Sequence, residues 1–178
     1  IKDSSGKSHT LSFTPEQLAM AVLTYGKAIQ FTVDVYAQFM KGRSCDFELS
    51  VDETQTPTDP VSHYYVACEV LERGVKITSL APRFSGEFQK GIDYIGDIAQ
   101  FEREMILHAA LADHFGYKLS IHSGSDKFSV FPIIGKYTGG RLHLKTAGTS
   151  WLEAVRLLAM KAPGFFREVY TYAKAHFS

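Results

Sequence analysis

Apolar positions along the chain follow a helical period in some segments and a strand-like alternation in others. The helical period begins over residues 13–39, where Thr14 is a suitable N-cap and Pro15 suits the first turn. Its expected apolar face includes Leu18, Val22, Ala28 and Val35. Further helices are expected at residues 60–74, 98–115, 150–162 and 163–176, with Gly116 closing the helix before it. Ser150 and Glu153 form an expected capping box.

Short apolar or alternating runs separate these helices and predict four strands. The runs are CDFELSV at 45–51, VKITSLAP at 75–82, YKLSI at 117–121 and RLHLK at 141–145. After the third strand, Ser125 is expected to cap a short helix that Pro132 and Gly135 limit. Regular strand–helix alternation predicts a parallel sheet with right-handed crossovers.

Four strand–helix units fit either a small doubly wound domain or about half of a TIM-type (β/α)8 barrel, which needs about 250 residues. Polar residues gather just past the strand ends, which favours the barrel. The sequence therefore predicts one α/β domain over residues 1–178, with 1–12 as a flexible leader. Because no initiator Met is present, we expect a fragment of a longer enzyme.

Composition narrows the possible partners. The 178 residues include 19 basic and 19 acidic side chains, so no cationic field indicates nucleic acid or an anionic membrane. No apolar run approaches the roughly 20 residues of a membrane span. The two cysteines have no metal-binding spacing and suggest a reducing compartment, consistent with the cytoplasm.

The loops after the first two strands carry candidate chemistry. Asp52 and Glu53 end the first strand, where a carboxylate can act as a general acid or base; solvated or turn-capping roles are as plausible, more so for Asp52. Glu87 and Gln89 offer oxygen ligands for a divalent cation. Arg83 suits a substrate carboxylate or, equally, a salt bridge to a neighbouring loop.

The other two loops add imidazoles. His122 ends the third strand, and a lone histidine there is more often a structural group than a ligand. Its loop also supplies Ser123, Ser125 and Lys127, which suit an anionic ligand. His143 and Lys145 share one face of the fourth strand, expected to be the inner face. The helical histidines, at positions 63, 108, 114 and 176, are expected on surfaces or at turns.

Three long stretches resemble one enzyme family. APRFSGEFQKGIDYIGD, YKLSIHSGSDKFSVFPIIGKYT and HLKTAGTSWLEAVR are similar to the metal-dependent tagaturonate epimerases, and the likeness continues from about Phe47 to the C-terminus. The resemblance implies interconversion of tagaturonate and fructuronate by inversion at C4. It also implies a divalent cation (Mn, Ni, Co or Zn) and a chain longer than this one.

The resemblance also suggests roles for the candidates. Glu53 becomes the catalytic acid or base, and His122 a metal ligand with Gln89, in the motif GEFQKG, or Glu87. The expected substrate-binding residues are Arg83, Ser123, Ser125, Lys127, His143 and Lys145. The partners expected are a small sugar acid and either a second copy or the missing part of the barrel.

Two alternatives remain open. The same polar rim would serve another metal-dependent barrel enzyme, such as a sugar isomerase or a class II aldolase. The chain could also be an inactive structural half-barrel that self-associates, because a half-barrel exposes sheet edges and an apolar face.

Overall fold

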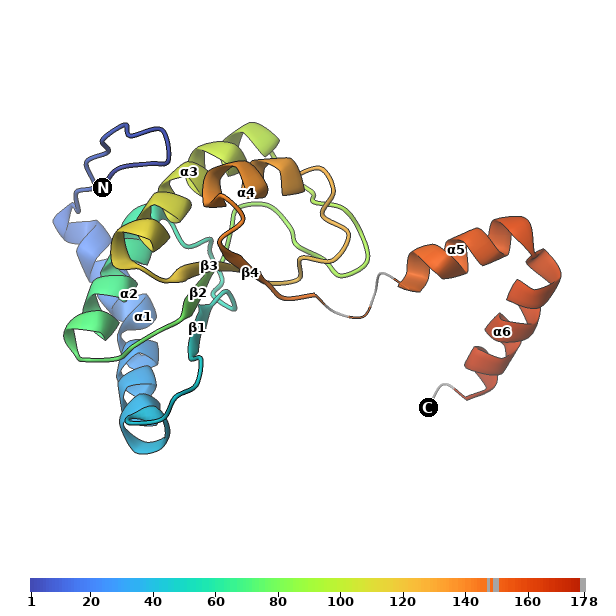
Figure 1. The fold of residues 1–178 in the computed structure, drawn as a ribbon, viewed down its shortest axis with the longest axis horizontal. Coiled ribbons are helices and arrows are strands. Elements are labelled where there is room, and N and C mark those ends of the chain that lie inside the picture. The colour runs from blue at the N-terminus through green and yellow to red at the C-terminus, as the bar shows by residue number, and fades with distance from the viewer. Residues whose placement is uncertain (147, 149–150, 177–178) are drawn as a thin grey trace.

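Four short strands form one parallel sheet in the order β1-β2-β3-β4 (Figure 1). The computed structural model describes residues 1–146, 148 and 151–176. The strands are β1 Glu48–Val51, β2 Ser79–Pro82, β3 Lys118–Ile121 and β4 Leu142–Leu144. A doubly wound sheet reverses its strand order, whereas a barrel adds each strand beside the previous one. The predicted α/β fold of four strand–helix units is confirmed, in the order of successive barrel strands.

Helices connect and follow the strands. They are α1 Pro15–Val35, continued by the π-helix η1 Tyr36–Met40, α2 Pro60–Glu72, α3 Ile98–Phe115, α4 Phe131–Thr138, α5 Trp151–Lys161 and α6 Pro163–Ala175. Thr14 and Gln17 cap α1 reciprocally, as its sequence predicts, and Gly116 ends α3 in the left-handed conformation with φ 83°. Among the described residues, no helix is both long enough and apolar enough to cross a membrane.

The sheet has one apolar face and one polar face. Leu49, Leu80, Leu119 and Leu142 lie at the same level of the four strands. All but Leu142 are fully buried, in one core with residues of α2 and α3 such as Val66 and Met105. Helices α1 to α4 pack on one another in chain order. The opposite, polar face is called the inner face below, because in a barrel the helices lie outside.

The first helix buries a different face from the one expected. Ala21, Tyr25, Ile29 and Thr32 are buried, whereas Leu18 and Val22 are exposed. Helix α1 packs on α2, and its buried face mixes Ile29 with the small Ala21 and the polar Thr32, so apolar side chains alone do not identify it. The predicted apolar face was therefore wrong, although the helix itself is confirmed.

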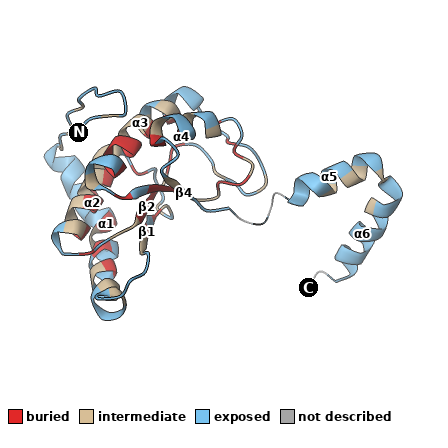
Figure 2. Ribbon diagram, in the orientation of Figure 1, coloured by how far each residue is buried: buried red, intermediate tan, exposed pale blue. Residues whose placement is uncertain are grey.

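The two ends of the chain differ from the sheet region. Within the expected leader, Lys2 and Ser8 form an antiparallel bridge and Asp3 accepts hydrogen bonds from Ser5 and Lys7, so its first residues fold back on themselves. At the other end, α5 and α6 pack on each other, stand apart from the sheet and contain no buried residue (Figure 2). The predicted Ser150 cap lies outside the described residues.

Two helical histidines lie in the core, which corrects the expectation that they are on the surface. His63 and His108 have no exposed area, and their Nδ1 atoms are 2.8 Å apart. The hydroxyl of Tyr117 lies 2.7 Å from His63 Nε2. Two facing Nδ1 atoms share one proton, so the two rings cannot both be cationic. Burial accordingly lowers the pKa of both rings, to about 4 for His108.

Candidate functional site

Strand alternation brings the polar candidates onto the inner face. In β1, Leu49 and Val51 point to the core, so Glu48 and Ser50 point the other way. The same alternation sends Ser120 inward from β3, and its neighbour in register is His143 of β4. The prediction that His143 lies on the inner face is thus confirmed. His122 follows β3 two residues after Ser120 and reaches the same face.

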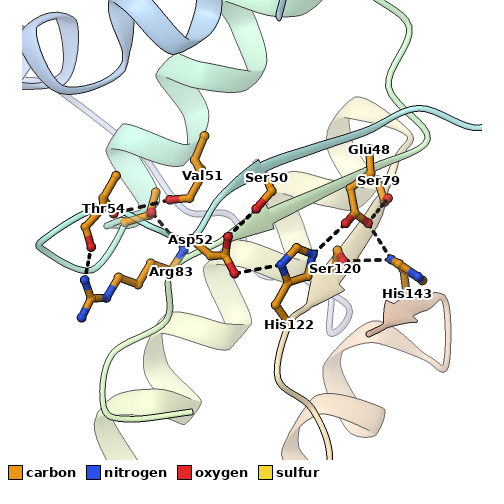
Figure 3. Close-up of polar contacts among 11 residues, drawn as sticks. Glu48, Ser50, Val51, Asp52, Thr54, Ser79, Arg83, Ser120, His122 and His143 are labelled. Atoms are coloured by element: carbon orange, nitrogen blue, oxygen red, sulfur yellow. Dashed lines mark hydrogen bonds and ion pairs between the residues drawn. The ribbon is translucent and has the colours of Figure 1, made fainter. Parts of the chain in front are cut away.

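His122 lies between two carboxylates from β1 and its end (Figure 3). Its Nε2 atom is 2.7 Å from Glu48 Oε1, and its Nδ1 atom is 2.8 Å from Asp52 Oδ2. Ser50 donates a hydrogen bond to the second oxygen of Asp52. The imidazole is therefore fixed by strand β1, not by aliphatic neighbours, and its side chain is only 10% exposed.

Glu48 is the central acceptor of this cluster. Its Oε2 atom accepts from Ser79 Oγ at 2.6 Å and lies 2.6 Å from His143 Nδ1, which is also 3.0 Å from Ser120 Oγ. Partial burial acts to raise the pKa of Glu48, but the hydrogen bonds from Ser79, His122, Ser120 and His143 outweigh it and hold the pKa at about 2. Glu48 is therefore ionised at neutral pH.

Glu48, His122 and Asp52 together hold an exchangeable proton. A neutral imidazole has one N–H and can donate to only one carboxylate. Both hydrogen bonds of His122 form at once only if the ring carries two protons or Asp52 carries one, given that Glu48 is ionised. This arrangement is suited to general acid–base chemistry, since the proton is held between groups that can each release it.

Two adjoining cavities meet at this cluster. The first, of about 380 Å³, lies beyond the carboxyl ends of β1, β2 and β3; the second, of about 470 Å³, covers the inner face toward β4. Both are lined by Asp52, Glu53, His122 and Ser123. Segments following all four strands thus converge on one rim, which is where ligands bind in parallel α/β folds.

The structure brings most of the predicted residues to these cavities. Glu53 is exposed there, and Arg83, Glu87 and Gln89 line the first cavity while Lys145 lines the second. The Arg83 guanidinium donates to the carbonyl of Thr54, and the Gln89 amide donates to the Glu87 carboxylate. His143 borders the cluster through Glu48 and lines neither cavity.

Two predicted substrate contacts point elsewhere. Lys127 has no exposed area, and its ammonium donates to the carbonyls of Gln89, Ile92 and Ser125. Those three bonds use every N–H of the ammonium, so Lys127 cannot bind substrate in this arrangement. Ser125 is buried and lines neither cavity, and it does not cap a helix, because α4 begins at Phe131 and runs through Pro132 and Gly135.

The expected metal ligands are near one another but do not form a complete site. Within residues 1–146, 148 and 151–176, no group of three or more His, Cys, Asp or Glu side chains has the geometry to hold a metal ion. Both ring nitrogens of His122 already face carboxylates, and Glu87 and Gln89 bond to each other. The nitrogen and carboxylate donors are of the types that divalent transition metals bind.

Sequence reasoning missed Glu48 and gave Asp52 little weight. The pattern contained a signal for both, since Glu48, Ser50 and Asp52 alternate with buried Leu49 and Val51 in the run ELSVD. Applied to β1 as it was to β4, this alternation places a second carboxylate opposite His122.

A polar cavity at the carboxyl ends of parallel strands, bordered by an imidazole between carboxylates, is the arrangement of an active site in a parallel α/β enzyme. The family model described as tagaturonate epimerase matches residues 2–178, and this chain belongs to that family. A tagaturonate/fructuronate epimerase from Thermotoga maritima is 52% identical over 170 residues, covering 94% of this chain and 35% of its own.

Solved structures agree with the family match. The native crystal structure of fructuronate-tagaturonate epimerase from Cohnella laeviribosi is 59% identical, with a TM-score of 0.86 over 95% of this chain and 35% of that one. A glycerol complex of the same enzyme is 58% identical, with a TM-score of 0.86 over 99% and 36%. The chain therefore spans about a third of the length of these relatives.

Proposed function

We propose that this chain forms part of an enzyme that interconverts tagaturonate and fructuronate by inversion at C4. The observation that carries this proposal is the match to the epimerase family over residues 2–178. The geometry supports it, since a rim with carboxylates, an imidazole and basic side chains suits a polar sugar acid. Because this chain spans about a third of its relatives, we propose that the rest of such an enzyme supplies the remaining active-site residues.

Some residues of this chain would bind the charged substrate, and others would transfer protons. Arg83 and Lys145 border the two cavities, so they are our candidates for binding the substrate carboxylate. Glu53 is the proposed acid or base, because its carboxylate is exposed in both cavities. Asp52 and His122 lie beside it and can accept or return a proton within the same hydrogen-bonded cluster.

We also propose that the enzyme binds a divalent cation, Mn, Ni, Co or Zn, with His122 as a nitrogen ligand. When bound, the cation would polarise a ketone or hydroxyl oxygen of the substrate. Because both nitrogens of His122 face carboxylates, binding requires one of these hydrogen bonds to be replaced. Metal binding should therefore release a proton at this site. Gln89 or Glu87 would add an oxygen ligand.

The remainder of the enzyme is the proposed partner of the exposed apolar side chains on α5 and α6. These are Trp151, Leu152, Leu157, Met160, Phe165, Val169, Tyr170 and Tyr172. In the Cohnella laeviribosi structures the segment matching almost this entire chain is about a third of a longer chain. Packing against that longer chain would cover this apolar surface. We also propose that the enzyme is located in the cytoplasm.

The decisive test uses the longer enzyme that contains this sequence. Purified enzyme should convert tagaturonate to fructuronate, and His122→Ala should lower its metal content and its activity together. His114→Ala, at an exposed position on α3, is the matched control and should change neither. Unchanged metal content in His122→Ala would refute the assigned ligand. Turnover of other ketoses without turnover of tagaturonate, tested with each of the four metals, would refute the substrate assignment.

A further inference from the structure

Lys127 is a buried cation held by carbonyl oxygens instead of by a carboxylate. Its Nζ atom lies 2.6 Å from the Gln89 oxygen, 2.5 Å from the Ile92 oxygen and 2.9 Å from the Ser125 oxygen. Its first two acceptors belong to the loop after β2, whereas Lys127 and Ser125 belong to the loop after β3. One ammonium therefore joins two loops that are more than thirty residues apart in the sequence.

A second contact joins the same two loops through a side chain of the β2 loop. The Asp93 carboxylate accepts hydrogen bonds from the backbone N–H of Ser129 at 3.2 Å and from its hydroxyl at 2.9 Å. At its base, the β2 loop is closed by paired hydrogen bonds between Glu87 and Ile95. The segment from Glu87 to Ile95 is thus fixed at its base and along its length.

The position of this segment matters because it forms a wall of the first cavity. Glu87 and Gln89 line that cavity, and the Gln89 carbonyl is one of the three oxygens that Lys127 holds. Burying an ammonium costs free energy that an apolar side chain of the same length would not incur. Burial also lowers the pKa of Lys127, although the charges of Asp126 and Asp93 oppose this shift. An apolar side chain would fill the same space without this charge.

We propose that Lys127 is a positioning residue that acts as a built-in cation. Its charge orders the carbonyls of Gln89 and Ile92, and so fixes the Glu87–Ile95 segment as a cavity wall. The value of this wall for catalysis rests on the proposed epimerase function. The ordering of the loop does not rest on that function, because it can be measured on the chain described here without any substrate.

Hydrogen exchange of peptides covering residues 86–96 tests the proposal. Lys127→Met keeps an unbranched apolar stem but lacks the terminal ammonium, and it should make these amides exchange about tenfold faster or more. Exchange in β3 and α3 should stay unchanged. Lys136→Met is the matched control, because Lys136 is an exposed lysine that pairs with Glu102 on the surface, and it should leave the loop as it is.

Chemical complementation separates charge from volume. Lys127→Ala removes the atoms of an n-propylammonium ion, so added n-propylammonium should restore slow exchange in residues 86–96, whereas equimolar sodium chloride should not. Unchanged loop exchange in Lys127→Met would overturn the proposal, because an apolar chain would then suffice. Faster exchange spread equally over β3 and α3, or no restoration by n-propylammonium, would also overturn it.

Discussion

The molecule holds two histidine clusters on opposite sides of its sheet, and they have opposite electrical characters. Between α2, α3 and β3, His63 contacts both His108 and Tyr117, and no carboxylate of the described residues forms a hydrogen bond with either ring. On the inner face, His122 and His143 contact Glu48 and Asp52. Burial keeps the first pair neutral, whereas both imidazoles of the inner cluster face carboxylates. Partners and solvent, and not the residue type, decide what an imidazole can do.

The largest expected effect concerns acid stability. The folded-state pKa of His108 is depressed to about 4 from an ordinary value of 6.5, so its contribution to stability is present above pH 6.5. That contribution is lost as the pH falls toward 4, because the unfolded chain takes up the proton first. We expect a loss of roughly 3 kcal/mol from His108 alone, with His63 adding to it. Urea unfolding from pH 7 to 4 measures this, and a flat profile would contradict the neutral pair.

Removing the hydroxyl of Tyr117 should have the next largest effect. Tyr117→Phe leaves the buried Nε2 atom of His63 without its partner, which should cost about 1–3 kcal/mol of unfolding free energy. Tyr137→Phe is a suitable control, since its hydroxyl bonds to the half-buried Glu102 and its loss should cost less. Equal effects of the two variants in urea unfolding would remove the distinction between the buried cluster and the surface.

Neutralising Glu48 should cost less stability than removing the Tyr117 hydroxyl. Glu48→Gln removes the charge facing His122 and His143 on a face open to solvent, where ion pairs contribute little. We expect a decrease of about 1 kcal/mol or less in unfolding free energy at pH 7. A loss as large as that of Tyr117→Phe would show that the inner cluster also supports the fold.

Salt should have the smallest effect on stability, and this effect should differ between the two histidine clusters. At 1 M sodium chloride the screening length is about 3 Å, so the difference in stability between the parent chain and Glu48→Gln should shrink. The difference in stability for Tyr117→Phe should persist, because Tyr117 and His63, which form this hydrogen bond, are both buried and uncharged. Parallel urea titrations at low and high salt measure both differences. A salt-dependent Tyr117→Phe effect would contradict the comparison.

Local signals in the sequence predicted the elements well. Capping at Thr14 and Gly116 involves residues within a few positions of each other, so the ends of α1 and α3 could be predicted from short segments. The buried face of α1 could not, because it depends on α2, which packs against it. The same limit applies to His63 and His108, because each contacts a polar side chain from another element of the core.

For the candidate site, the rim was predictable and its internal bonding was not. Parallel strands bring their ends together, so Glu53, Arg83, Gln89 and His122 could be placed on one rim from the strand order. The carbonyls of Gln89 and Ile92 that Lys127 contacts belong to the loop after β2, which is distant in the sequence. No pattern of residues around Lys127 predicts these contacts. Glu48 was encoded by alternation, but recognising it required knowing which face of β1 is buried.

The division of the sheet into an apolar and a polar face has a consequence for how such a protein can change. Leucines and valines on the helix side hold the strands in place, so serines, acids and imidazoles on the other side contribute little to packing. Substitutions there can alter recognition while leaving the scaffold intact. The sheet thus combines a conservative support with a readily varied surface, an advantageous starting point for acquiring new binding specificities.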